Sequence, residues 1–111
     1  MVFTPLGVRV HSARMWKDNN LPYPDRLDRM HDELATATKY VAEGGLDAVA
    51  YTCTTGSFYK GVGWDTEMCE IMSEAAGVPA FATSPSVVTA LNELGAKKLS
   101  VVTYCGFSLF P

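Results

Sequence analysis

The chain has 111 residues, of which 48% are hydrophobic, and it carries a formal net charge of −3. This length and hydrophobic content suit one folded core, and the absence of a basic stripe argues against nucleic acid as a partner. No apolar run approaches the roughly 20 residues that cross a bilayer, and the first residues lack a signal-peptide pattern, so we expect a soluble, cytoplasmic protein without a membrane partner.

The first predicted element is a strand over residues 8–15, where apolar and polar side chains alternate as in a strand at the edge of a sheet. Residues 17–24 are rich in Asn, Asp and Pro, which predicts a loop. From residue 25 up to the pair Gly44 and Gly45, the spacing of apolar residues predicts one amphipathic helix that the glycines end. Its apolar positions are Leu27, Met30, Leu34, Ala37 and Val41.

The next segments alternate between strand and helix patterns. Residues 46–52 are short and almost wholly apolar, which predicts a central parallel strand covered on both faces by helices. Residues 66–76 have the apolar spacing of a helix, and Gly77 is placed to end it. Residues 78–82 then form a second short predicted strand.

The last elements are a helix and a strand. Ser84 and Pro85 predict a helix start, because a serine hydroxyl satisfies a free backbone amide and proline suits the first turn. Gly95 ends this helix, whose predicted core-facing residues are Val87, Val88, Leu91 and Leu94. Residues 98–103 are the last predicted strand. The alternation predicts an α/β fold with three layers, α/β/α, around a parallel sheet.

A candidate site follows the central strand. In parallel sheets, ligands bind at the carboxyl ends of the strands, and Cys53 lies directly after residues 46–52. The hydroxyls and the glycine that follow predict a nest of backbone amides, which would bind a carboxylate and favour the thiolate form of Cys53. A free cysteine can also simply fill space in a core. From the residues alone, both interpretations stay open.

The remaining candidate residues are the cysteines and His31. The cysteines Cys53, Cys69 and Cys105 have neither zinc-finger nor CxxC spacing, so we expect free thiols and no metal site. Cys69 lies among the apolar positions of its predicted helix, and we interpret it as an unreactive packing thiol. His31 lies beside charged residues and is interpreted as a boundary residue of its helix.

The run GLDAVAYTCTTGSFYKG and the later run GVPAFATSPSVVTALNELGAKKLSVVT resemble the first half of maleate isomerases and arylmalonate decarboxylases, within the aspartate/glutamate racemase superfamily. The CTTGS run at residues 53–57 resembles the segment that carries an active-site cysteine in maleate isomerases. Arylmalonate decarboxylases have glycine at the position of Cys53, which favours the isomerase. Racemases typically have Asn-Thr where this chain has Thr54 and Thr55, so a racemase ranks lower.

The resemblance implies a flavodoxin-like half of a racemase-type fold and a chemistry that needs no cofactor. Cys53 would add to maleate, a small dicarboxylate, and release fumarate. The implied substrate-binding residues are Thr54, Thr55, Gly56, Ser57 and Tyr104. Family members commonly have a Thr-Pro-Tyr sequence after the last strand of this half, and its tyrosine reaches a carboxylate, whereas this chain reads Thr103-Tyr104-Cys105.

The resemblance also implies that the first strand and the second half of the relatives are missing. We therefore interpret residues 1–103 as a truncated N-terminal α/β domain and residues 104–111 as an atypical tail. Two alternatives to an active isomerase follow. The chain is an inactive fragment or a carboxylate-binding module, or it forms a homo-oligomer that supplies the missing half of the site.

Overall fold

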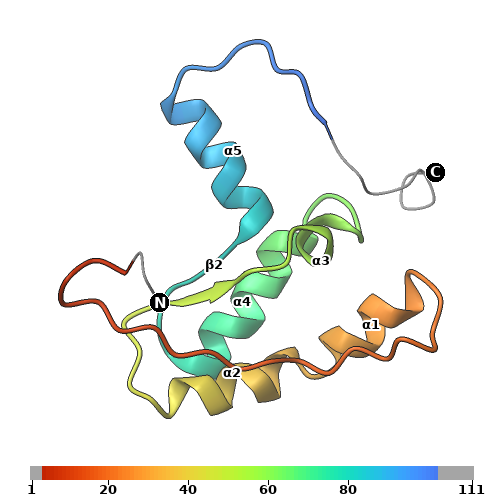
Figure 1. The fold of residues 1–111 in the computed structure, drawn as a ribbon, viewed down its shortest axis with the longest axis vertical. Coiled ribbons are helices and arrows are strands. Elements are labelled where there is room, and N and C mark those ends of the chain that lie inside the picture. Colours follow the sequence, from red (N-terminus) through yellow and green to blue (C-terminus); the bar gives the residue numbers. More distant parts are fainter. Residues whose placement is uncertain (1–3, 103–111) are drawn as a thin grey trace.

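The computed structural model describes residues 4–102 (Figure 1). Tyr104 and the predicted tail over residues 104–111 lie outside the described residues. The elements, in chain order, are α1 (Asp25–His31), α2 (Leu34–Ala42), β1 (Val49–Tyr51), α3 (Thr54–Phe58), α4 (Trp64–Ala76), β2 (Ala80–Ala82) and α5 (Thr83–Glu93). Within the described part of the chain, no helix is both long and apolar enough to span a membrane.

The sheet consists of β1 and β2, which pair in parallel with Ala50 opposite Phe81. This pairing confirms the predicted α/β class and the parallel sheet. Side chains alternate along the strands, so Val49 and Tyr51 are buried whereas Ala50 and Phe81 are exposed. The described residues therefore cover only one face of the sheet, whereas the sequence predicted helices on both faces.

One hydrophobic core lies between the sheet and the helices on its covered face. Within it, α2 packs against α4, and α4 packs against both strands. The buried hydrophobic residues are Leu27, Met30, Leu34, Val49, Tyr51, Trp64, Met68, Met72 and Ala82. The predicted helix over residues 66–76 is confirmed as α4, and Gly77 ends it in the left-handed conformation, with a φ of 70°.

The predicted single helix from residue 25 is divided into α1 and α2. The amide of Glu33 donates to the carbonyl of Met30, three residues back, which tightens the backbone between the two helices. The Glu33 carboxylate accepts a hydrogen bond from the backbone amide of Trp16 at 3.2 Å. Gly45 has a φ of 70° beyond the end of α2, at the place that the sequence indicated.

The predicted edge strand over residues 8–15 is wrong. This segment forms an extended loop, and a groove of about 480 Å³ lies between it, α2 and β1. A strand needs a neighbouring backbone with which to exchange hydrogen bonds, and the groove keeps β1 out of reach. Met15 packs against the core, so the segment is held by side-chain contact instead.

The predictions for the C-terminal part were partly wrong. Helix α5 begins at Thr83, one residue before the predicted start, and the Ser84 hydroxyl donates to the Ser57 carbonyl rather than capping the helix. The exposed fractions of the predicted core residues are 51% for Val87, 58% for Val88 and 80% for Leu94. They stay exposed because α5 points away from the sheet (Figure 1) and buries no residue. Residues 98–102 form no strand.

Candidate functional site

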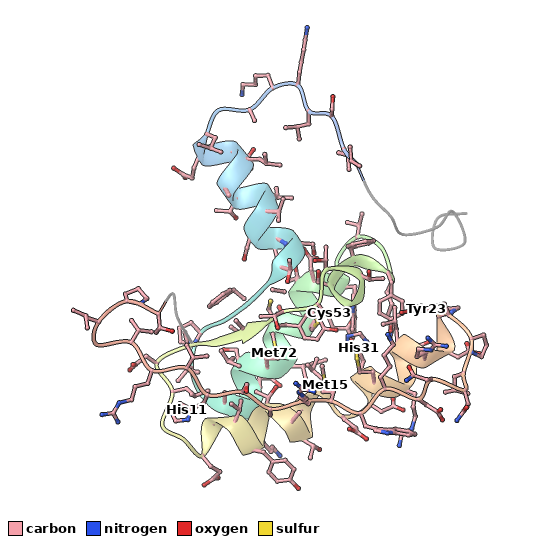
Figure 2. All side chains as sticks on the ribbon, viewed as in Figure 1. His11, Met15, Tyr23, His31, Cys53 and Met72 are labelled. Atoms are coloured by element: carbon pink, nitrogen blue, oxygen red, sulfur yellow. The ribbon has the colours of Figure 1, made fainter. Side chains whose placement is uncertain are left out.

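Cys53 lies two residues after the end of β1 and directly before α3 (labelled in Figure 2). Its backbone is extended, with φ −126° and ψ 109°, and its carbonyl accepts the amide of Ser57 at 3.0 Å in the first turn of α3. The side chain is partly buried and packs against the core. The structure therefore has a free thiol at the carboxyl end of a parallel strand, the location that the sequence predicted.

The residues after Cys53 form a helical turn rather than the predicted nest. A nest needs backbone conformations of alternating hand. Residues 54–58 are instead helical as α3, and no residue other than glycine has a positive φ in residues 4–102. Thr54 is exposed beside Cys53, and Thr55 is partly buried. The predicted site residues before Tyr104 thus lie together on one short helix.

Ser57, a predicted substrate-binding residue, joins α3 to α5. Its side chain is fully buried, and its hydroxyl donates to the Thr54 carbonyl at 2.7 Å while accepting the Ser84 amide at 3.1 Å. The Ser84 hydroxyl in turn donates to the Ser57 carbonyl at 3.1 Å. These bonds engage the Ser57 hydroxyl inside the protein and fix the orientation of the turn that carries Thr54.

His31 and Tyr51 form a buried pair. The Tyr51 hydroxyl is 2.8 Å from His31 Nε2, and His31 Nδ1 is 2.7 Å from the Leu27 carbonyl oxygen. A carbonyl only accepts, so Nδ1 carries a proton and Nε2 of the neutral ring accepts from Tyr51. Burial is the main cause that lowers the pKa of His31, which favours the neutral ring.

The surroundings of Tyr51 shift the pKa of its hydroxyl upward. Burial raises the pKa of Tyr51 above its ordinary value, and the neighbouring Cys53 side chain raises it further. The hydroxyl also lies against Gly56, where an added Cβ would overlap it. Glycine at this position therefore lets the first turn of α3 approach Tyr51 closely.

An outer group of aromatic and charged side chains encloses His31. Tyr59 stacks on the imidazole at a centroid distance of 5.3 Å, and Trp64 meets it edge-on at 5.2 Å. The Tyr59 hydroxyl donates to Asp28 at 2.6 Å, and Lys60 forms an ion pair of 3.1 Å with the same carboxylate. The hydrogen bond from Tyr59 is the main cause that lowers the pKa of Asp28.

His31 and Tyr51 were not predicted to belong to the site, although two features of the sequence indicate that they are buried near it. Tyr51 precedes Cys53 by two residues in an extended segment, a spacing that puts both side chains on one face. His31 follows Leu27 by four residues and therefore continues the buried face of the helix.

Cys69 has a different environment from Cys53. It lies in α4 and lines an apolar groove of about 820 Å³ between α4, β2 and α5. Burial, and then the charge of Asp65, raise the pKa of Cys69, which favours the unreactive thiol form. These features support the prediction of a packing thiol. Residues 4–102 contain no group of three or more His, Cys, Asp or Glu residues that could hold a metal ion.

Comparison with known proteins gave consistent matches. The family described as arylmalonate decarboxylase matches residues 22–106. The arylmalonate decarboxylase of Bordetella bronchiseptica is 25% identical over 80 residues, which cover 72% of this chain and 33% of that protein. The chain thus spans about a third of the length of this curated relative.

Solved structures of arylmalonate decarboxylase are also similar. A liganded double mutant, with one glycine changed to cysteine and one cysteine to serine, gives a TM-score of 0.61 at 28% identity, covering 65% of this chain and 31% of that one. Another arylmalonate decarboxylase structure gives a TM-score of 0.57 at 26% identity. This match covers 61% of this chain and 30% of that one. These neighbours confirm the expected racemase-like α/β fold over part of its extent. The match over residues 22–106 shows that this chain belongs to the arylmalonate decarboxylase family.

Proposed function

We propose that Cys53 is the reactive thiol of a cofactor-independent cis-trans isomerase that converts maleate to fumarate. The observation that carries the proposal is the location of a partly buried free thiol between a parallel strand and the first turn of α3. Because the chain spans about a third of its curated relative, the proposal concerns the enzyme in which this chain supplies the Cys53 side of the site.

The proposed reaction has three steps. The Cys53 thiolate adds to one alkene carbon of maleate, and the electron pair of the double bond moves to the neighbouring carbon, where the adjacent carboxylate stabilises it. Rotation about the resulting single bond follows. The electron pair then re-forms the double bond, the carbon–sulfur bond breaks, and fumarate leaves with the thiolate regenerated.

Thr54 and Thr55, with the amides of α3, are proposed to hold a substrate carboxylate beside the thiol. Thr54 is exposed next to Cys53, and the bonds of Ser57 fix the turn that carries it. Such donors accelerate the reaction only as far as they bind the developing charge more tightly than the charge of the substrate. Substitution of Thr54 by alanine should therefore lower kcat/KM.

Decarboxylation of an arylmalonate is the second candidate, favoured by the family match over residues 22–106. Loss of carbon dioxide from the substrate would leave an enediolate, and the Cys53 thiol would give its proton to the α-carbon. The two candidates differ in substrate and in product, because only decarboxylation releases carbon dioxide and incorporates one solvent-derived proton at the α-carbon.

Turnover of maleate and of phenylmalonate, followed by proton NMR, tests the proposal. We expect the wild-type protein and Cys69→Ser to form fumarate from maleate, and Cys53→Ser to lose this activity. Full activity of Cys53→Ser would overturn the proposal. Turnover of phenylmalonate alone would replace it with the decarboxylase.

The alternatives without independent activity are tested with the same preparation. Binding of maleate without turnover, measured by calorimetry, would support a carboxylate-binding module. A concentration-dependent rise in both activity and molecular mass, measured by light scattering, would support self-association that completes the site.

A further inference from the structure

We propose that this chain forms a dimer in which residues 98–102 of each copy lie in a groove beside β2 of the other copy. This β2 groove is the one of about 820 Å³ between α4, β2 and α5. The inference goes beyond the proposed function, because none of residues 53–57 lines the groove.

One side of the β2 groove is a strand edge without a neighbour. Among the described residues, β2 pairs only with β1, and the Val49 amide donates to the Pro79 carbonyl at 3.0 Å. Backbone groups alternate sides along a strand, so the amide and carbonyl of Ala80 point away from β1. Ala80 also lines the groove. Such an edge can bind an added strand through backbone hydrogen bonds.

Residues 98–102 have a strand pattern but no strand partner. They read KLSVV, so that Leu99 and Val101 alternate with polar residues, yet they form no strand in this structure. The exposed fractions are 57% for Leu99 and 81% for Val101. The segment therefore presents apolar side chains and unpaired backbone groups that an added strand would bury.

The segment and the groove match in length. Along α4, the lining residues run from Asp65 to Ser73, a distance of about 12 Å at the helical rise per residue. Five residues in a strand extend over about 13 Å from the first to the last. One segment of residues 98–102 therefore fits along the wall that α4 provides.

The two surfaces also have complementary charge. The lining residues include the carboxylates of Asp65 and Glu70 and no Lys, Arg or His. Lys97 and Lys98 begin the exposed segment, and neither forms an ion pair within residues 4–102. Opposite charges on the two surfaces steer association and suppress wrong partners. The groove thus favours a segment that carries lysines, which a second copy supplies.

Helix α5 holds this segment away from the groove of its own chain. Thr83 follows Ala82 directly, so no loop separates β2 from α5. The Thr83 hydroxyl donates to the Tyr51 carbonyl, and the amide and hydroxyl of Ser84 both bond to Ser57, each at 3.1 Å. These bonds fix the start of α5, which points away from the sheet (Figure 1).

The connection after α5 is too short for a return to β2. Over the helix and its cap, the chain rises about 18 Å from Thr83 to Gly95. The three residue steps from Gly95 to Lys98 cover at most about 11 Å. The whole segment therefore cannot lie along β2 of its own chain, whereas a second copy has no such restriction. Two-fold symmetry makes the exchange reciprocal and fills both grooves.

Disulfide trapping tests which chain occupies the groove. Cys69 lines it, and a Cys53→Ser/Cys105→Ser background leaves Cys69 as the remaining cysteine. With Val101→Cys added, oxidation by diamide of a mixture of ¹⁴N- and ¹⁵N-labelled chains should join Cys69 of one copy to position 101 of another. Ser100→Cys is the matched control, because adjacent side chains point to opposite faces of a strand.

Peptide mass spectrometry distinguishes the outcomes. Disulfides that combine both isotopes, abundant for Val101→Cys and sparse for Ser100→Cys, would support the exchange. Disulfides only within one chain would show that each segment occupies its own groove and would overturn the proposal. Equal yields from the two variants would overturn it as well.

Sedimentation equilibrium of the full chain tests the charge match. The wild type should form dimers, and Lys97→Glu/Lys98→Glu should raise the dissociation constant by about tenfold or more, because like charges then meet. Adding Glu70→Lys should recover part of this loss. The control Arg14→Glu/Lys39→Glu makes the same change of net charge at exposed positions outside the groove, and it should leave the constant nearly unchanged.

A monomeric wild type, or an equal loss in the control, would overturn the proposal. Neither experiment uses a substrate. Dimers trapped through position 101 without turnover of maleate would therefore keep this interface and remove the isomerase, and turnover by a monomer would do the reverse.

Discussion

Replacement of Gly56 by alanine should destabilise the protein, although alanine is normally the better helix former. In a helix, glycine to alanine typically gains roughly 0.5–1 kcal/mol. Here the new methyl group would overlap the Tyr51 hydroxyl and approach the ring carbon Cζ to 3.0 Å. The bond to His31 holds that hydroxyl in place, so Tyr51 cannot move aside without breaking it.

The cost has two parts. Crowding a well-packed site typically costs about 1–3 kcal/mol, and leaving the buried His31 Nε2 without a partner costs about 1–3 kcal/mol. After the helix gain is subtracted, we expect Gly56→Ala to lower the free energy of unfolding by about 2–4 kcal/mol. In a Tyr51→Phe background the hydroxyl is absent, so the same substitution should cost about 1–2 kcal/mol less.

Urea denaturation, followed by the fluorescence of buried Trp64, gives these free energies for the wild type, both single variants and the double variant. Comparing the two backgrounds isolates the contact between Gly56 and Tyr51. A stabilising Gly56→Ala, or an equal cost in both backgrounds, would refute the close approach of α3 to Tyr51.

Two further predictions concern stability. Because the pKa of folded His31 lies below its unfolded value, the unfolded chain binds more protons, and stability should fall as the pH drops below about 6.5. Between pH 7.5 and 5.5, the melting temperature of His31→Gln should therefore decrease less than that of the wild type. Equal decreases for the two proteins would contradict this prediction. Met68→Ala should cost about 2–5 kcal/mol, since Met68 is 0% exposed. The control Val62→Ala, at a fully exposed position, should stay within about 0.5 kcal/mol of wild type, and similar losses for both would contradict the core assignment.

The sequence predicted best those features that depend on local pattern. Apolar spacing and Gly77 were enough to predict α4, and the apolar run before Cys53 was enough to place the thiol at the end of a strand. Both rest on sequence patterns that extend over a few neighbouring residues. The resemblance to the arylmalonate decarboxylase branch was confirmed over residues 22–106.

Features that depend on distant partners were predicted less well. Residues 8–15 have a strand pattern but no adjacent backbone with which to pair, and α5 has an apolar face that the described residues leave exposed. The link between His31 and Tyr51 spans 20 residues, and only the fold brings the two side chains together. Periodicity identifies buried positions, but it does not identify which buried polar groups meet.

The role of Cys53 is tested most directly by asking whether maleate protects it from iodoacetamide. Maleate held beside the thiol should slow the alkylation of Cys53 while leaving the rate at Cys69 unchanged in the same molecule. Fumarate formation should be lost in parallel as Cys53 is modified. Equal rates with and without maleate at Cys53, or undiminished turnover after its complete alkylation, would contradict a reactive role for this cysteine.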